Sequence, residues 1–316
     1  MPIRVTDPVR LGEVKLPSGR RLGWAEWGPE AGPPVLYCPG AATSRWLGLD
    51  GDLVDRLAIR LVALDRPGLG ASDPLPGRGF ADWTRDVRDL LALRGLPVPA
   101  LVGFSQGAPF ALACAAAGLA SAVAVVSGTD ELAHPSVSTQ LPPELRLLVA
   151  DIAADPLAAE AFFRGFGDAA RMWDFILATS GAADRSLYSE PEFARAFRRA
   201  LAEGLAQGPD GYARDAVLAM GRWSFDLAAI AVPVDLWYGA GDTSAAHSPD
   251  HGATLVTRIP GARRHVIADA GGALPWTHTD AILRTLLARI ACAEPTAPGP
   301  RPTGARPHGS TDRNRP

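Results

Sequence analysis

The chain has 316 residues, of which 47% are hydrophobic, and a formal net charge of −3 at pH 7. This length suits one large α/β core, or a core with an insertion, because single cores stop growing near about 250–300 residues. The small negative charge gives no electrostatic reason to expect nucleic acid as a partner, so we expect a small molecule instead.

Short β-type segments alternate with helical patterns, which is typical of a mostly parallel sheet covered by helices on both faces. Residues 20–27 alternate polar and apolar side chains, as an edge strand does. A helix is predicted where Trp83, Val87 and Leu90 recur at helical spacing, with Gly95 ending it. Continuous apolar runs, typical of central parallel strands, occupy 34–38, 61–65, 100–104, 122–126, 234–239 and 265–268.

One stretch, residues 110–126, is almost wholly apolar and has nearly the length of a membrane span. It is dominated by alanine, is broken by Gly118 and Ser121, and becomes β-branched at Val123. This pattern favours a buried helix followed by a buried strand, so we expect no membrane association.

The alternation of strands and helices stops between residues 129 and 226, where only helical patterns occur. We interpret this segment as a helical cap. Its aromatic side chains form either the cap's own core or, for some of them, the wall of a cleft. The predicted organisation is a core at 1–128, the cap at 129–226, the second part of the core at 227–292, and a disordered Pro/Gly/Arg-rich tail at 293–316.

Two features bear on cellular location. The first ten residues, MPIRVTDPVR, lack the apolar segment of a signal peptide. The cysteines, Cys38, Cys114 and Cys292, are few and odd in number, which favours free thiols in a reducing compartment. We therefore expect a cytoplasmic protein.

The motif with the clearest chemistry is GFSQG, from Gly103 to Gly107. It directly follows the predicted strand at 100–104 and precedes a helical run, which is the setting of a nucleophile elbow. There a serine, here Ser105, sits on a strained turn between small neighbours and at a helix N-terminus. The alternative is an ordinary tight turn that contains a serine.

With these elements in place, the chain resembles the α/β-hydrolase superfamily, and particularly its bacterial members with a helical cap. The resemblance extends over about residues 10–290 and implies a mostly parallel eight-stranded sheet flanked by helices. It is carried, in chain order, by SGRRLGWAEWG, PPVLYCPGAATSR, VALDRPGLGASDP, VGFSQGAPFALA and FDLAAIAVPVDLWYGAGD.

The resemblance implies roles for several residues. Asp242, in WYGAGD, is the expected acid that orients an imidazole, although it could instead be a turn residue after Gly241. The backbone N–H groups of Gln106 and Ala41 are the expected oxyanion hole, with Ser44 as a further contributor. The chain has Pro-Gly at 39–40, where the family usually has His-Gly.

The expected catalytic histidine is missing. The family pattern Gly-His-Leu-Pro aligns with residues 271–275 and places Ala273, or in an ungapped count Gly272, at the histidine position. Of the other histidines, His278 is the only one on the same loop, so it is the candidate base, with an exposed helix-start residue as the alternative. The remaining histidines are not expected to act as the base. His134 and His265 are predicted to be structural or exposed, and His308 lies in the predicted tail. His247 and His251 are predicted to lie on the start of a surface helix just past Asp242.

Two functions follow from this pattern. The first is a hydrolase of a small apolar ester or amide in which Ser105 attacks, Asp242 supports, and His278 or a substrate group acts as base. The second is a pseudo-hydrolase that binds a small ligand, or a relative with non-hydrolytic chemistry. No cofactor is expected, because RPGLGASD at 66–73 lacks the third glycine and the Lys-Ser/Thr of nucleotide-binding loops, and no metal-ligand spacing is present.

Overall fold

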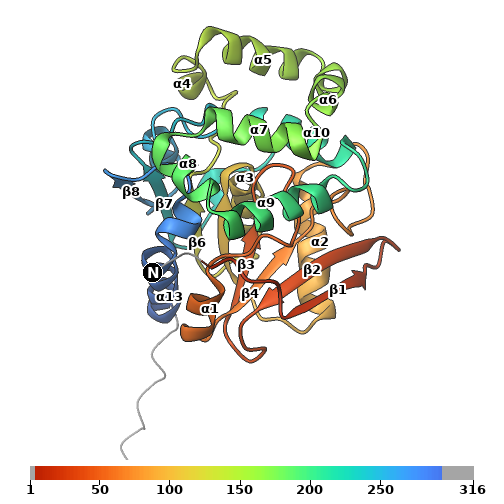
Figure 1. Cartoon of the computed structure of the whole chain (residues 1–316), viewed down its shortest axis with the longest axis vertical. Coiled ribbons are helices and arrows are strands. Elements are labelled where there is room, and N and C mark those ends of the chain that lie inside the picture. Colours follow the sequence, from red (N-terminus) through yellow and green to blue (C-terminus); the bar gives the residue numbers. More distant parts are fainter. Residues whose placement is uncertain (1–3, 294–316) are drawn as a thin grey trace, which may run out of the picture.

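Eight strands form one sheet in residues 4–293, the part of the chain that the computed structural model describes (Figure 1). Their order is β1-β2-β4-β3-β5-β6-β7-β8; β1–β2 and β2–β4 pair antiparallel, and the other pairs are parallel. The strands are β1 (Arg10–Lys15), β2 (Arg21–Trp27), β3 (Pro34–Cys38), β4 (Arg60–Leu64), β5 (Ala100–Phe104), β6 (Val123–Val126), β7 (Val234–Gly239) and β8 (Arg263–Ile267). The expected mostly parallel sheet is confirmed.

Both edges of the sheet differ from the sequence prediction. β2 is not an edge strand, because β1 pairs along its outer side. At the other end, β8 is the edge strand rather than a central one, and its side chains are exposed or half-buried. The short run HVIA at 265–268 resembles a central strand in composition, but only β7 pairs with it.

Helices cover both faces of the sheet, as expected. On one face pack α2 (Phe80–Leu93), α3 (Ala108–Ala116) and α11 (Ala253–Arg258); on the other pack α1 (Gly51–Arg56) and α13 (Thr279–Ala293). The predicted helix before Gly95 is α2, and Gly95 has a left-handed φ of +61°. The apolar stretch 110–126 is the remainder of α3 followed by β6, as predicted. Within residues 4–293 no helix combines the length and the hydropathy needed to cross a membrane.

A run of helices separates β6 from β7 and lies above one end of the sheet in Figure 1. This helical insertion contacts the loop after β3: Ser44 N–H donates to the Ala200 carbonyl (3.1 Å), and a Cβ on Gly204 would lie 2.0 Å from the Ala42 carbonyl oxygen. Its helices are α4 (Pro135–Ser138), α5 (Pro143–Ala154), α6 (Pro156–Arg164), α7 (Ala169–Thr179), α8 (Ala182–Tyr188), α9 (Pro191–Gly204) and α10 (Asp210–Met220).

The remaining expectations concern the cysteines and the tail. Cys38 and Cys114 are buried free thiols, and burial raises the pKa of Cys38 to about 12. The side chain of Cys292 and residues 294–316, which make up nearly all of the predicted tail and include His308, lie outside the described part of the chain.

Candidate active site

Ser105 begins a single 3-10 turn (Ser105–Gly107) between β5 and α3. Its φ of +49° lies in the left-handed region, which a non-glycine residue occupies at a cost of about 1–3 kcal/mol. The flanking glycines allow close packing: a Cβ on Gly107 would lie 2.0 Å from the Cys38 carbonyl oxygen, and one on Gly103 would lie 2.8 Å from Ala108 Cα. The motif GFSQG therefore forms the strained turn that the sequence predicts.

The hydroxyl of Ser105 faces an imidazole, and that imidazole belongs to His247. Ser105 Oγ lies 2.9 Å from His247 Nε2, and His247 Nδ1 lies 2.6 Å from Asp242 Oδ2. Both contacts are within the reach expected between a nucleophile, its base and the group that orients the base. Ser105 and His247 are each only 9% exposed, so water has little access to this chain of contacts.

Asp242 lies three residues beyond the end of β7, and its charge state is set by its neighbours. Burial favours the neutral acid, but the nearby His247 ring and the Ser244 N–H, which donates to Asp242 Oδ1 (3.0 Å), outweigh burial. The pKa of Asp242 is therefore below its usual value. An ionised Asp242 favours the imidazole form with its proton on Nδ1, which leaves Nε2 free to accept from Ser105.

An apolar pocket of about 310 Å³ opens beside Ser105. Much of its wall comes from the helical insertion, including Leu148, Phe163, Met172, Ile176, Phe197 and Tyr212. Three aromatic rings that also line the pocket are between 40% and 53% exposed: Phe162, Phe166 and Phe175. The Phe166 ring packs against the other two. The expectation that the aromatic residues form the insertion's own core holds only in part, because several of them line this pocket.

A sequence profile described as the alpha/beta hydrolase fold matches residues 33–279. The chain belongs to the α/β-hydrolase fold family. A search of curated proteins found no match. Among solved structures, the chain is similar to an enol-lactonase from Burkholderia xenovorans LB400, with 19% identity, a TM-score of 0.63, and coverage of 89% of this chain and 100% of that one.

Two esterases are also similar to this family member. For EaEST from Exiguobacterium antarcticum the identity is 16%, the TM-score 0.63, and the coverage 88% of this chain and 98% of that one. For RhEst1 from Rhodococcus sp. ECU1013 the identity is 21%, the TM-score 0.60, and the coverage 89% of this chain and 99% of that one. At these identities the likeness establishes the fold.

The glycines after β8, where the sequence lacks the expected histidine, pack closely against acidic side chains. A Cβ on Gly272 would lie 2.9 Å from Asp242 Oδ1, and one on Gly271 would lie 2.4 Å from the Asp184 carboxylate. Asp184, on α8, accepts from Gly272 N–H (2.8 Å) and Ala273 N–H (3.0 Å). The loop thus packs against two carboxylates without a side chain between them. Burial, together with the nearby Asp242 charge, raises the pKa of Asp184 despite these two bonds.

The structure does not bring His278 to Ser105; His278 lies directly before α13, as the helix-start alternative expects, and it is half-buried. Its backbone N–H closes the short helix α12 (Leu274–Thr277) by donating to the Leu274 carbonyl (2.9 Å). Its ring contacts Thr277 Oγ1 through Nδ1 (2.9 Å), and His247, not His278, contacts Ser105. Burial lowers the pKa of His278.

The placement of His247 on the start of a surface helix is also wrong. α11 begins only at Ala253, and His247 lies in the turn-rich loop before it. The signal in the sequence is the segment GDTSAAHSPD: an acid and a histidine five residues apart, in a loop rich in small and turn-forming residues that can fold both side chains together. The other histidines in the described part of the chain have different neighbours: His134 caps α4, His265 pairs with Asp235, and His251 lies near Tyr238.

The loop after β3 lies beside Ser105, since a Cβ on Gly40 would be 3.5 Å from Ser105 Cβ. Arg66 holds this loop: its Nη1 donates to the Pro39 carbonyl (2.7 Å) and its Nη2 to the Gly40 carbonyl (2.9 Å). Because C=O and N–H of a trans peptide point in opposite directions, fixing the Gly40 carbonyl also fixes the direction of the Ala41 N–H. Ala41 and Gln106 both line the pocket.

Ser44, unlike Ala41 and Gln106, is not part of the pocket lining. Its N–H donates to the Ala200 carbonyl (3.1 Å), and its Oγ accepts from the Trp46 N–H (3.3 Å). Ser44 therefore anchors the helical insertion to the loop after β3 instead of facing the pocket.

Proposed function

We propose that this protein is a serine hydrolase that cleaves small apolar carboxylic esters. The observation that carries the proposal is the chain of contacts from Ser105 Oγ through the His247 ring to Asp242. A binding protein has no need of this chain, or of a serine held in a strained turn. These features support hydrolysis over the alternative of a pseudo-hydrolase.

In the proposed reaction, Ser105 Oγ attacks the ester carbonyl while its proton passes to His247 Nε2, and Asp242 stabilises the imidazolium that forms. The oxyanion accepts hydrogen bonds from the N–H groups of Ala41 and Gln106. The proton on Nε2 then passes to the departing alkoxide, which leaves as the alcohol. Water enters, His247 takes its proton, and the resulting attack releases the carboxylic acid and returns the proton to Ser105.

The pocket supports an apolar substrate. Its lining is dominated by aliphatic and aromatic side chains from the helical insertion, with hydroxyl, amide and carboxylate groups close to Ser105. Such a site gains affinity by removing apolar surface from water, while its few polar groups orient the reacting carbonyl. The partner we propose is accordingly a small molecule.

A fluorophosphonate probe tests this proposal, because it labels only a serine that is activated as a nucleophile. We expect stoichiometric labelling of Ser105, identified by peptide mass spectrometry, and hydrolysis of p-nitrophenyl butyrate. Ser105→Ala is the matched control and should lose both. An unlabelled, folded wild-type protein would contradict the proposal.

Arg66→Lys tests the support of the oxyanion hole. A lysine keeps the charge opposite Asp215, which Arg66 Nε contacts at 2.6 Å, but it lacks the fork that holds two carbonyls at once. We expect kcat to fall by about 10–100-fold with KM little changed, because one lost oxyanion donor costs about 10²–10³-fold. Steady-state kinetics on p-nitrophenyl butyrate measure this.

Arg78→Lys is the control for that substitution. Arg78 pairs with the same Asp215 and with the Gly211 carbonyl; unlike Arg66, it does not hydrogen-bond the described loop after β3. If both substitutions lowered kcat equally, the effect would come from the buried ion pairs and not from the orientation of Ala41.

A further inference from the structure

The buried carboxylate of Asp130 contacts Ser248, the residue that follows His247 in the chain. We propose that Asp130, acting through Ser248, is a positioning residue that holds the His247 ring between Ser105 and Asp242. This inference rests on the proposed hydrolase function.

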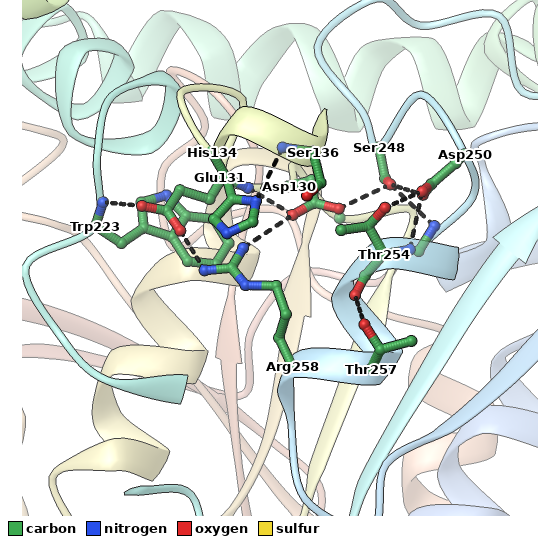
Figure 2. Close-up of polar contacts among 12 residues, drawn as sticks. Asp130, Glu131, His134, Ser136, Trp223, Ser248, Asp250, Thr254, Thr257 and Arg258 are labelled. Atoms are coloured by element: carbon green, nitrogen blue, oxygen red, sulfur yellow. Dashed lines mark hydrogen bonds and ion pairs between the residues drawn. The ribbon is translucent and has the colours of Figure 1, made fainter. Parts of the chain in front are cut away.

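The loop that carries His247 needs support from outside itself. Residues 240–252, between β7 and α11, contain no helix or strand, so no regular hydrogen-bond ladder holds the His247 backbone. Ser248 is the anchor. Its N–H donates to the Gly128 carbonyl (3.0 Å), its Oγ lies 3.1 Å from Asp130 Oδ2, and its Oγ accepts from the Gly252 N–H (2.9 Å). Figure 2 shows the Ser248 hydroxyl pointing toward the carboxylates of both Asp130 and Asp250.

The segment that holds Ser248 also holds Ser105. Thr129 N–H donates to the Ser105 carbonyl (3.1 Å), one residue before Asp130. On its other side, Tyr238 of β7 donates its hydroxyl hydrogen to the Gly128 carbonyl (3.2 Å). Residues 128–130 therefore contact the backbone of the proposed nucleophile and the neighbour of the proposed base. A shift of this segment would change the separation of Ser105 Oγ and His247 Nε2.

The Ser248 hydroxyl can hydrogen-bond both Asp130 and Asp250 only if one of the two carboxyl groups carries a proton. Its Oγ lies 3.1 Å from Asp130 and 3.0 Å from Asp250, yet a hydroxyl has one hydrogen to donate. Both contacts become hydrogen bonds if Asp130 donates to Ser248 and Ser248 donates to Asp250. Asp250 is suited to accept, because its carboxylate is already held by Thr254 N–H (2.8 Å) and other donors at the start of α11.

The surroundings of Asp130 fit a carboxyl group that carries a proton in part of the accessible pH range. Burial raises the pKa of Asp130 to about 6 and the nearby Asp250 charge adds to the rise, against the opposing Glu131 N–H. The nearest cation, Arg258, pairs with Glu131, and its Nη1 is 3.9 Å from Asp130 (Figure 2). An asparagine at 130 reproduces the donor and acceptor of the protonated acid.

Four variants test the proposal: Asp130→Ala, Ser248→Ala, Asp130→Asn and, as control, Thr257→Val. Thr257 is an exposed residue of α11, and among residues 4–293 its hydroxyl bonds only the Thr254 carbonyl, within its own helix (2.8 Å). On p-nitrophenyl butyrate we expect each alanine variant to lower kcat by about 10–100-fold with KM within about twofold, since misplacing a reacting group by about 1 Å costs up to about 10²-fold. Asp130→Asn should recover most of the loss, and Thr257→Val should match the wild type.

A second readout does not depend on turnover. The low-field proton NMR resonance of His247 Nδ1–H reports its bond to Asp242; it should broaden or disappear in the alanine variants and persist in Asp130→Asn. If Asp130→Ala does not fold, Ser248→Ala carries the test. An unchanged kcat in folded Ser248→Ala, or equal losses in Asp130→Asn and Asp130→Ala, would overturn the proposal. Failure of the hydrolase function itself is distinguished by a wild-type protein that neither turns over substrate nor reacts with fluorophosphonate.

Discussion

His247→Ala is expected to lower kcat for ester hydrolysis by about 10⁶-fold, which corresponds to about 8 kcal/mol of transition-state stabilisation. The reason is that, within residues 4–293, the one imidazole in contact with Ser105 Oγ is His247, whose Nε2 lies 2.9 Å away, and an unactivated serine hydroxyl is a weak nucleophile. Hydrolysis should still be about 10³–10⁴-fold faster than the uncatalysed reaction in water, because the proposed oxyanion donors and the pocket are unchanged. Single-turnover and steady-state assays with p-nitrophenyl butyrate measure both quantities.

The matched control is His278→Ala. His278 contacts Thr277 at the end of a short helix and not Ser105, so we expect its removal to change kcat by less than about twofold, as surface substitutions away from a site usually do. Added imidazole should restore part of the activity of His247→Ala by entering the space that the ring leaves. A large loss in His278→Ala together with a small one in His247→Ala would reverse the assignment of the base.

Asp242→Asn is expected to lower kcat by about 10⁴-fold while leaving the fold intact. The amide can donate to His247 Nδ1, which favours the imidazole form with its proton on Nε2, and that form cannot accept the proton of Ser105. Because the pKa of Asp242 lies below its usual value, the wild-type carboxylate stays ionised in mild acid. Its contribution to stability is present above the unfolded-state pKa and is lost only as pH falls through the lower folded-state pKa.

The measurements for this variant are kcat on p-nitrophenyl butyrate and thermal unfolding between pH 3 and 8. Asp226→Asn is a suitable control, since Asp226 is an exposed carboxylate that accepts a backbone N–H from Ala228 (2.9 Å) at a turn outside the pocket. Full activity in Asp242→Asn would show that His247 does not depend on Asp242 for its orientation.

The sheet and the turn at Ser105 were predictable because their causes are local. A left-handed serine flanked by glycines follows from steric limits within five residues, and buried parallel strands need apolar side chains on both faces. The edges were harder to predict. β1 mixes charged and apolar side chains, and its positions alternate between half-buried and exposed. HVIA has the composition of a buried strand although it lies at an edge. Pairing partners, and not composition, decide which strand is outermost.

By itself, the sequence of this protein determined the fold family, the strained turn at Ser105 and the place of Asp242 as the candidate acid, since each depends on short-range sterics or on the order of elements along the chain. Only the tertiary structure brought an imidazole, that of His247, to Ser105. Ser105 and His247 are 142 positions apart in the chain, and their contact depends on the path of an irregular loop. That loop is held by the bonds of Ser248 to Gly128 and Asp130 after β6, and Gly272 packs closely against its Asp242. A missing histidine in one loop therefore did not imply that no imidazole contacts Ser105, because side chains from different loops can reach the same point at the end of the sheet.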